Sequence, residues 1–319
     1  MVAEAVKVAY VFPGQGAQYA GMGRDIYDSY ASARAVFEQA DEALGFSLSQ
    51  LCFNGPDEQL RQTVNAQPAI VSVSLALLAA IRDSENNRGL PVPAFVAGHS
   101  LGEYTAMAAA GVFDFATAIY LTHQRGRLMH QAGLKNPGGM AAIIGLDEET
   151  LSDICSQSSA RIVNFNCPGQ LVISGGKKSL KKAIELAEAK GAKRVVPLQV
   201  SGAFHTHYMQ PAADSLAEIL EDIHFEAPRI PIVANTTARE ITTAEMAKEE
   251  LLSQLCNSVH WQRSIEYMID NGVATFIEIG PGSVLSGLIK RINRNVKTIN
   301  IGDAEAIKDI KAVFKGEQV

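Results

Sequence analysis

The sequence predicts an α/β protein in which a large subdomain with a parallel sheet carries a smaller inserted subdomain. Short buried strands alternate with helical segments toward both ends of the chain, and this alternation favours a parallel sheet. The middle of the chain has the order βαββαβ, which is the ferredoxin-like arrangement. With 319 residues, 47% of them hydrophobic, the chain can bury a sizeable core and an added subdomain.

In the first part of the chain, the strands and helices are predicted from periodicity. Residues 6–12 are β-branched and aromatic and end at Pro13-Gly14, so we expect a buried strand there. Apolar residues then recur at helical spacing over 22–44 and over 67–82. Residues 94–97 form a second short apolar strand that ends at Gly98.

Between residues 137 and 199 the elements are shorter. We expect, in order, a strand at 139–146, a helix at 148–157, strands at 161–166 and 171–175, a helix at 179–190 and a strand at 194–200. This order defines the inserted subdomain, for which we predict the boundaries 135–203. Residues 1–134 and 204–319 then form the large subdomain.

After the insertion the chain returns to longer alternating elements. These are a helix at 208–223, a strand at 230–234, helices at 244–256 and 261–271, and a strand at 274–279. Gly280-Pro281-Gly282 then turns the chain into a last helix.

Composition excludes several classes of function. A net charge of −6 provides no general basic field for nucleic acid. The four cysteines contain no CxxC pair, so neither a metal site nor a disulfide framework is indicated. The start of the chain has no basic segment followed by a long apolar one, and the apolar run at 70–81 is too short and serine-interrupted to span a bilayer. We expect a cytoplasmic protein and, by default, a monomer.

The turn Gly98-His99-Ser100-Leu101-Gly102 fits the pattern GxSxG. It follows a short apolar strand and precedes a helix-compatible run at 103–110, which is the context that this pattern requires. Such a turn exposes the serine hydroxyl at the end of the strand, and the helix directs N–H groups toward it. Ser100 is therefore a candidate nucleophile. The alternative is a plain strand-to-helix turn in which Ser100 only caps the helix.

A serine nucleophile needs a base within hydrogen-bond reach. His205 and His207 lie in an irregular stretch directly after a predicted strand, where an α/β sheet assembles its site. His99 adjoins Ser100, but on a tight turn its ring should point away. The other histidines have surface or core contexts. A dinucleotide turn at Gly14-Gln15-Gly16 is disfavoured, because Tyr19 stands where a third glycine is needed.

Seven segments together resemble the malonyl-CoA:acyl carrier protein transacylases, including the acyltransferases that serve polyketide synthases. The segments occur in the family's order, and the resemblance covers nearly the whole chain. They are 11–18 (VFPGQGAQ), 98–104 (GHSLGEY), 124–129 (QRGRLM), 164–170 (NFNCPGQ), 202–205 (GAFH), 254–259 (QLCNSV) and 278–282 (EIGPG).

This resemblance implies roles for five residues in catalysis. Ser100 would be the nucleophile and His205 the general base and acid. The backbone carbonyl of Gln254 would hold the imidazole in place of a carboxylate, which is adequate for thioester exchange. The backbone N–H groups of Gln15 and Leu101 would stabilise the oxyanion.

The resemblance also implies residues that bind the acyl group. Arg125 would be a bidentate clamp on the free carboxylate of a malonyl group, whereas the plain interpretation is a solvated residue of the amphipathic helix at 115–131. Met129, on the same helix face, would line the same pocket. Phe204 would crowd an α-methyl branch and favour malonyl groups. Asn166 corresponds to a cleft-lining position, although turn formation before Pro168-Gly169 explains this asparagine equally well.

Two further features concern the pathway and the partner. Gly202 departs from the His-Ala-Phe-His form common in the polyketide acyltransferases and from the Pro-Ser-His form of fatty-acid enzymes, which favours a free-standing acyltransferase of a polyketide assembly line. A group of lysines gives the small subdomain a basic side that is either a docking face for an acidic carrier protein or a solvated helix face. This group comprises Lys177, Lys178, Lys181 and Lys182, with Lys190, Lys193 and Arg194 nearby.

Together these observations predict an α/β-hydrolase-like large subdomain with an inserted ferredoxin-like one. The expected activity is ping-pong transfer of malonyl from malonyl-CoA to the phosphopantetheine thiol of a holo acyl carrier protein, without metal or redox cofactor. One alternative is a hydrolase of acyl carrier protein thioesters, which has no need for Arg125. Another is a non-catalytic docking domain, which has no need for Ser100 and His205.

Overall fold

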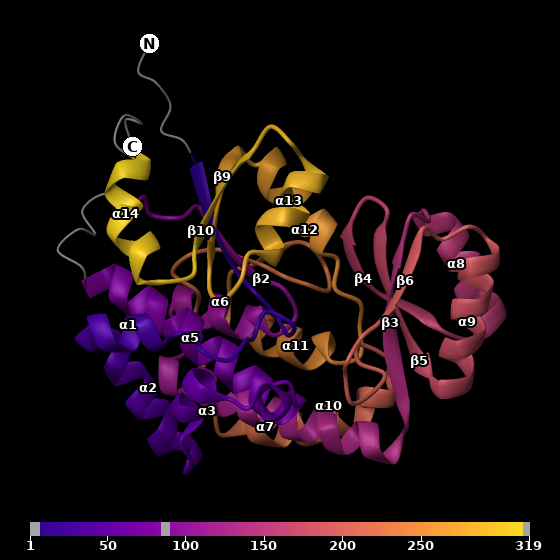
Figure 1. The fold of residues 1–319 in the computed structure, drawn as a ribbon, viewed down its shortest axis with the longest axis horizontal. Coiled ribbons are helices and arrows are strands. Elements are labelled where there is room, and N and C mark those ends of the chain that lie inside the picture. Colours follow the sequence, from indigo (N-terminus) through magenta and orange to yellow (C-terminus); the bar gives the residue numbers. More distant parts are fainter. Residues whose placement is uncertain (1–6, 84–89, 315–319) are drawn as a thin grey trace.

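The computed structural model describes residues 7–83 and 90–314, and it contains two sheets (Figure 1). The larger sheet has six strands in the order β10-β9-β1-β2-β7-β8. All neighbouring pairs in it are parallel except β7 with β8. The strands are β1 Lys7–Phe12, β2 Phe95–Gly98, β7 Ile232–Val233, β8 Glu240–Ile241, β9 Val273–Ile279 and β10 Lys297–Ile301.

Alternation along β1 divides the core into two layers. Val8, Tyr10 and Phe12 pack into the larger apolar cluster, while Ala9 and Val11 face the smaller one. One side of the sheet is covered by α12 (Trp261–Asp270) and α13 (Val284–Ile292), and the other by the remaining large-subdomain helices. These are α1 Arg24–Ser29, α2 Ala31–Leu44, α3 Leu48–Asn54, α4 Asp57–Leu60, α5 Thr63–Asp83, α6 Gly102–Ala110, α7 Phe115–Lys135, α10 Gln210–Glu221, α11 Ala244–Gln254 and α14 Ala304–Phe314.

The second sheet is antiparallel, with the order β4-β5-β3-β6. Its helices pack against it around a separate apolar cluster, at the right of Figure 1. The elements are β3 Gly138–Ile144, α8 Glu148–Ser158, β4 Arg161–Cys167, β5 Gln170–Gly176, α9 Lys177–Ala189 and β6 Arg194–Pro197. This sequence order and strand order are those of the ferredoxin-like fold, as predicted. The exact boundaries 135–203 stay a prediction.

The two sheets are joined beside the edge strand β4. Asn164 forms a parallel bridge with Val259, and the N–H of Phe165 donates to the carbonyl of Val259 at 2.9 Å. The ring of Phe165 also stacks on that of His260, with centroids 4.8 Å apart. These contacts fix the small sheet against the segment that follows α11.

Several predicted elements differ from the observed ones. The single helix expected at 22–44 is two helices, because Tyr30 has extended dihedral angles between α1 and α2. The strands expected at 194–200 and 230–234 are shorter, since β6 ends at Pro197 and β7 has two residues. The helix after Gly282 is not the last element, because β10 pairs with β9 and α14 follows.

Helix α5 is longer than the apolar run that predicts it. Its 21 residues are long and apolar enough to cross a membrane, and a window of 18 residues in it has a mean hydropathy of 1.8. However, 83% of that window is buried inside the fold, and α5 packs between α2 and α7. Burial against protein therefore accounts for its apolar character.

Candidate active site

The turn between β2 and α6 has the geometry of a nucleophile elbow. Ser100 has a positive φ of 49°, which is rare for a residue with a side chain. A Cβ atom at Gly98 would overlap the backbone of Gly102, and one at Gly102 would overlap the carbonyl of Phe12. Both positions therefore require glycine, and the close approach of strand and helix exposes Ser100 at the end of β2.

A buried asparagine and glutamate hold this elbow from behind. The N–H of Ser100 donates to Oδ1 of Asn235 at 2.6 Å, and Nδ2 of Asn235 donates to the carbonyl of Gly98 at 2.7 Å. Glu103 accepts from both the backbone N–H and Nδ2 of Asn235, each at 2.8 Å. Both side chains are buried, so these bonds are shielded from water and stabilise the strained turn.

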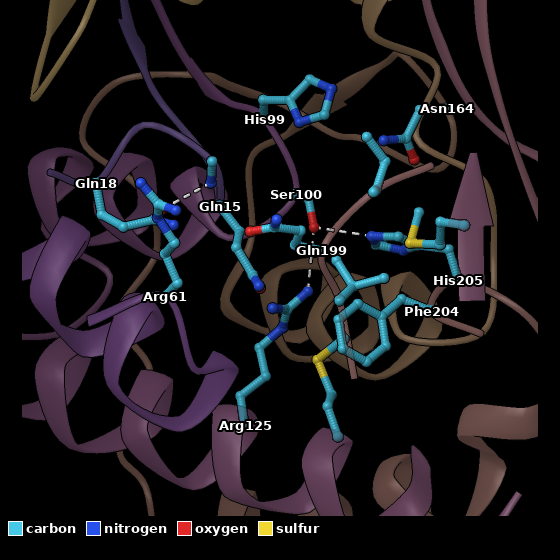
Figure 2. Close-up of a pocket in the computed structure, with 15 residues that line it drawn as sticks. Gln15, Gln18, Arg61, His99, Ser100, Arg125, Asn164, Gln199, Phe204 and His205 are labelled. Carbon is cyan, nitrogen blue, oxygen red and sulfur yellow. Dashed lines mark hydrogen bonds between the residues drawn. The ribbon is translucent and has the colours of Figure 1, made fainter. Parts of the chain in front are cut away.

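His205 lies where a general base for Ser100 is needed (Figure 2). Its Nε2 lies 2.8 Å from Oγ of Ser100, and its Nδ1 lies 2.8 Å from the carbonyl oxygen of Gln254. A carbonyl only accepts, so Nδ1 carries the proton and Nε2 is free to accept the serine proton. The fold thus brings together the predicted group of Ser100, His205 and Gln254 from three segments that are far apart in the sequence.

The loop after β1 adjoins the elbow. A Cβ atom at Gly14 would overlap the carbonyl of His99, so glycine permits this approach. Within the described residues, the backbone N–H groups of Gln15 and Leu101 have no hydrogen-bond partner. The side chain of Gln15 is anchored to Oγ1 of Thr63 at 3.2 Å. Two unpaired donors beside a serine are the arrangement that stabilises an oxyanion.

Arg125 is not on a solvated helix face, because its side chain is 1% exposed. Its Nη1 donates to Oε1 of Gln67 at 2.8 Å, and Nη2 donates to Oε1 of Gln254 at 2.8 Å and to Oγ of Ser100 at 3.2 Å. The guanidinium also lies over the ring of Tyr104, 5.7 Å from its centroid. Figure 2 shows it directed at Ser100 from α7.

A cavity of about 360 Å³ opens over Ser100, and Arg125, Met129, Phe204 and His205 lie in its wall. Asn166 is not among its described lining residues. It lines an adjacent hollow of about 230 Å³, where its Oδ1 lies 2.9 Å from Nε2 of His99. The nearby Asn164 lines both spaces. The ring of His99 thus hydrogen-bonds to Asn166 and points away from Ser100, as predicted.

Burial lowers the pKa of the base, His205, well below the ordinary value of a histidine. Removal from water and, to a smaller extent, the charge of Arg125 lower the pKa of His205 to about 3. The hydrogen bond to Gln254 opposes this shift. His205 is therefore neutral, and able to accept a proton, throughout the physiological range.

This titration gives a prediction for pH dependence. A general base works in its neutral form, and His205 becomes protonated only as pH falls toward about 3. The rate at which a fluorophosphonate inactivates the enzyme should stay nearly constant from about pH 8 to about pH 5. In Arg125→Ala the acid limb should move to higher pH, since one cause of the lowered pKa is removed. A halving of the wild-type rate near the ordinary histidine pKa would contradict this assignment.

Sequence reasoning missed three buried polar residues of the site: Gln67, Glu103 and Asn235. Glu103 directly follows the GxSxG turn, and Asn235 lies two residues after the end of β7, at the edge where sites assemble. That position is a signal that could have identified Asn235. Gln67 lies inside an apolar helix next to Pro68, and one glutamine in such a run has no local signal for function.

The basic residues of the small subdomain lie mostly on its outer surface. Lys177, Lys178, Lys181 and Lys182 are exposed on α9, and Lys181 makes an ion pair of 3.8 Å with Glu185. Exposed pairs of this kind contribute little to stability. Both interpretations, a docking face and a solvated face, fit this exposure, so docking stays a prediction.

Comparison with known proteins agrees with this geometry. Residues 9–312 match the family model of the acyl transferase domain. A malonyl CoA-acyl carrier protein transacylase of Bacillus subtilis is 44% identical over 307 residues, which are 95% of each chain. One from Escherichia coli K12 is 44% identical over 288 residues, covering 89% of this chain and 92% of the relative.

Solved structures show the same similarity in three dimensions. An acyl carrier protein S-malonyltransferase of Vibrio cholerae superposes with a TM-score of 0.91 at 42% identity, over 96% of this chain and 100% of the other. A malonyl-transacylase in complex with the acyl carrier protein of a type II polyketide synthase has a TM-score of 0.91 at 39% identity, over 96% and 99%. The similarity therefore covers both subdomains.

Proposed function

Since this chain belongs to the acyl transferase domain family, we propose that it is a malonyl-CoA:acyl carrier protein S-malonyltransferase acting through an acyl-enzyme on Ser100. The observation that carries this proposal is the buried guanidinium of Arg125, 3.2 Å from the hydroxyl that His205 activates. A nucleophile, a base and a buried cation meet in one cavity, which suits a thioester whose acyl group ends in a carboxylate.

In the first half-reaction Ser100 attacks the thioester carbonyl of malonyl-CoA. As the C–O bond forms, the hydroxyl proton moves to Nε2 of His205, and the N–H groups of Gln15 and Leu101 bind the oxyanion. Collapse of this intermediate breaks the C–S bond. The proton on His205 goes to the leaving sulfur, so CoA departs as a neutral thiol and malonyl remains as an ester of Ser100.

The second half-reaction uses the same groups in the reverse sense. The phosphopantetheine thiol of a holo acyl carrier protein gives its proton to His205 and attacks the malonyl ester. The C–O bond breaks, and His205 returns the proton to Oγ of Ser100. A carbonyl partner such as that of Gln254 stabilises the transient imidazolium less than a carboxylate would, which is sufficient because a thiolate is a good leaving group.

Selectivity for malonyl follows from the wall of the cavity. One methylene separates the ester carbonyl of malonyl from its carboxylate, so the carboxylate lies within reach of a guanidinium that already contacts Oγ of Ser100. Pairing with Arg125 is bidentate and shielded from water. Phe204 and Met129 occupy the apolar side of the same cavity, where they crowd a branched acyl group.

Intact-protein mass spectrometry tests this function. After mixing with malonyl-CoA, the wild-type protein should gain one malonyl mass, which should move to added holo acyl carrier protein faster than free malonate appears. An adduct that decays to malonate and ignores the carrier would support the hydrolase instead. No adduct would support the non-catalytic alternative.

The cellular context is part of the same proposal. Malonyl transfer supplies fatty acid or polyketide synthesis, and the sequence around Gly202 favours a polyketide assembly line. We place the reaction in the cytoplasm and assign it to a monomer that meets holo acyl carrier protein as its partner. Competition between fatty-acid and polyketide carrier proteins for the malonyl-enzyme distinguishes the two pathways.

A further inference from the structure

Gln67 is a fully buried residue of α5 that does not appear among the described residues lining the cavity. Its Oε1 accepts from Nη1 of Arg125 at 2.8 Å, and its Nε2 is directed at the sulfur of Met129 at 3.5 Å. Gln67 therefore contacts two cavity residues from behind, and it acts on an acyl group only through them.

The positive charge of Arg125 is buried. Among residues 7–83 and 90–314, no carboxylate lies within 4.0 Å of its guanidinium. Glu103 is the nearby acidic residue, but the side chain of Gln254 stands between them: its Oε1 accepts from Arg125 and its Nε2 donates to Glu103 at 2.5 Å. The Nε atom of Arg125 has no hydrogen-bond partner in the part of the chain that the structure describes.

An unpaired buried charge is costly, and proteins usually place a carboxylate beside such a group. Here the two side chains that accept from it at 2.8 Å, Gln67 and Gln254, are neutral amides, which fix the orientation of the guanidinium through hydrogen bonds and contribute no negative charge of their own. An acyl group that ends in a carboxylate supplies the missing counterion, whereas acetyl does not. The preference for a charged acyl group thus depends on the neutrality of these partners.

We propose that Gln67 is a positioning residue that determines the preference for dicarboxylic acyl groups, because its amide orients Arg125 without neutralising it. This inference rests on the proposed function. A glutamate at the same position would reach Nη1 with the same geometry and supply an internal counterion. The substrate carboxylate would then enter a site already occupied by negative charge.

The test compares malonyl-CoA with acetyl-CoA as acyl donors. Gln67→Glu should lower the ratio of kcat/KM for malonyl-CoA to that for acetyl-CoA by roughly 100-fold, mainly by raising KM for malonyl-CoA. Gln67→Met keeps the volume but not the hydrogen bond, so it should lower kcat/KM for malonyl-CoA, and with it the ratio, by only roughly 10-fold. Thermal unfolding of each variant checks that the fold is intact.

The comparison of the charged variant Gln67→Glu with the neutral variant Gln67→Met tests the proposal. An unchanged ratio in Gln67→Glu, or an equal loss of preference in Gln67→Met, would show that Gln67 has a structural role only. If Gln67→Glu does not fold, Gln67→Asp against Gln67→Asn repeats the comparison with an isosteric pair that differs in charge, and only the aspartate should lose the preference. A wild-type protein that forms no malonyl adduct would overturn the proposed function instead, and the two failures are therefore distinct.

Discussion

Replacement of Ser100 with alanine is expected to abolish the malonyl adduct and to lower kcat for malonyl transfer by at least about 10⁴-fold. The reason is that, of the described residues that line the cavity, Ser100 alone carries a hydroxyl or thiol, and this hydroxyl contacts His205. An alanine at the same φ of 49° is strained to a similar degree, so the fold should persist. Intact-protein mass spectrometry measures the adduct, and a coupled assay of CoA release measures kcat.

A matched control separates the loss of the nucleophile from general effects of a serine-to-alanine substitution. Ser152→Ala changes an exposed serine on α8 of the small subdomain and should leave both measurements at the wild-type level. If Ser100→Ala still formed a stable malonyl adduct, another residue would carry the acyl group, and the elbow would be only a helix cap.

Replacement of Arg125 with alanine is expected to lower kcat/KM for malonyl-CoA by about 10²- to 10³-fold, since a buried charged hydrogen-bond pair is worth several kcal/mol. The same variant should keep or improve the use of acetyl-CoA, because an unpaired charge leaves the cavity wall. The measurement is the ratio of kcat/KM for the two donors, which removes effects common to both.

Arg127→Ala is the appropriate control for Arg125. Arg127 is on the same helix, two residues away, but it is exposed and bonds only to the side chain of Gln124 among the described residues. It should leave the ratio unchanged. If Arg125→Ala behaved in the same way as Arg127→Ala, the clamp would have to be assigned to another group.

The lowered pKa of His205 makes the free energy of unfolding depend on pH. The unfolded chain protonates His205 near its usual pKa, whereas the folded protein does so only near 3. Between these values the unfolded state binds more protons, so this residue makes the fold less stable as pH falls. The cost is tolerated because a neutral imidazole is what the reaction needs.

The fold was predictable to the extent that it depends on local patterns. Hydrophobic periodicity and the positions of glycines predict the two apolar strands, the elbow and the βαββαβ order. The structure contains all of them. The strand β10 and the helix α14 were missed, because pairing with β9 rather than a strong local signal makes that segment a strand. The break at Tyr30 was missed because helical spacing of apolar residues continues across it.

For the site, the sequence alone indicated that Ser100 stands on a strained turn, with His205 or His207 as a base from a distant loop, and the family resemblance selected His205 and added Arg125 and Gln254. Only the tertiary structure decided that Arg125 is buried, that no carboxylate of the described residues lies within 4.0 Å of it, and that Gln67 and Gln254 hold it. Fifty-eight and 129 residues separate it from these partners. The charge balance of a buried group depends on which side chains packing brings against it, and packing between distant segments leaves no periodic trace in the sequence.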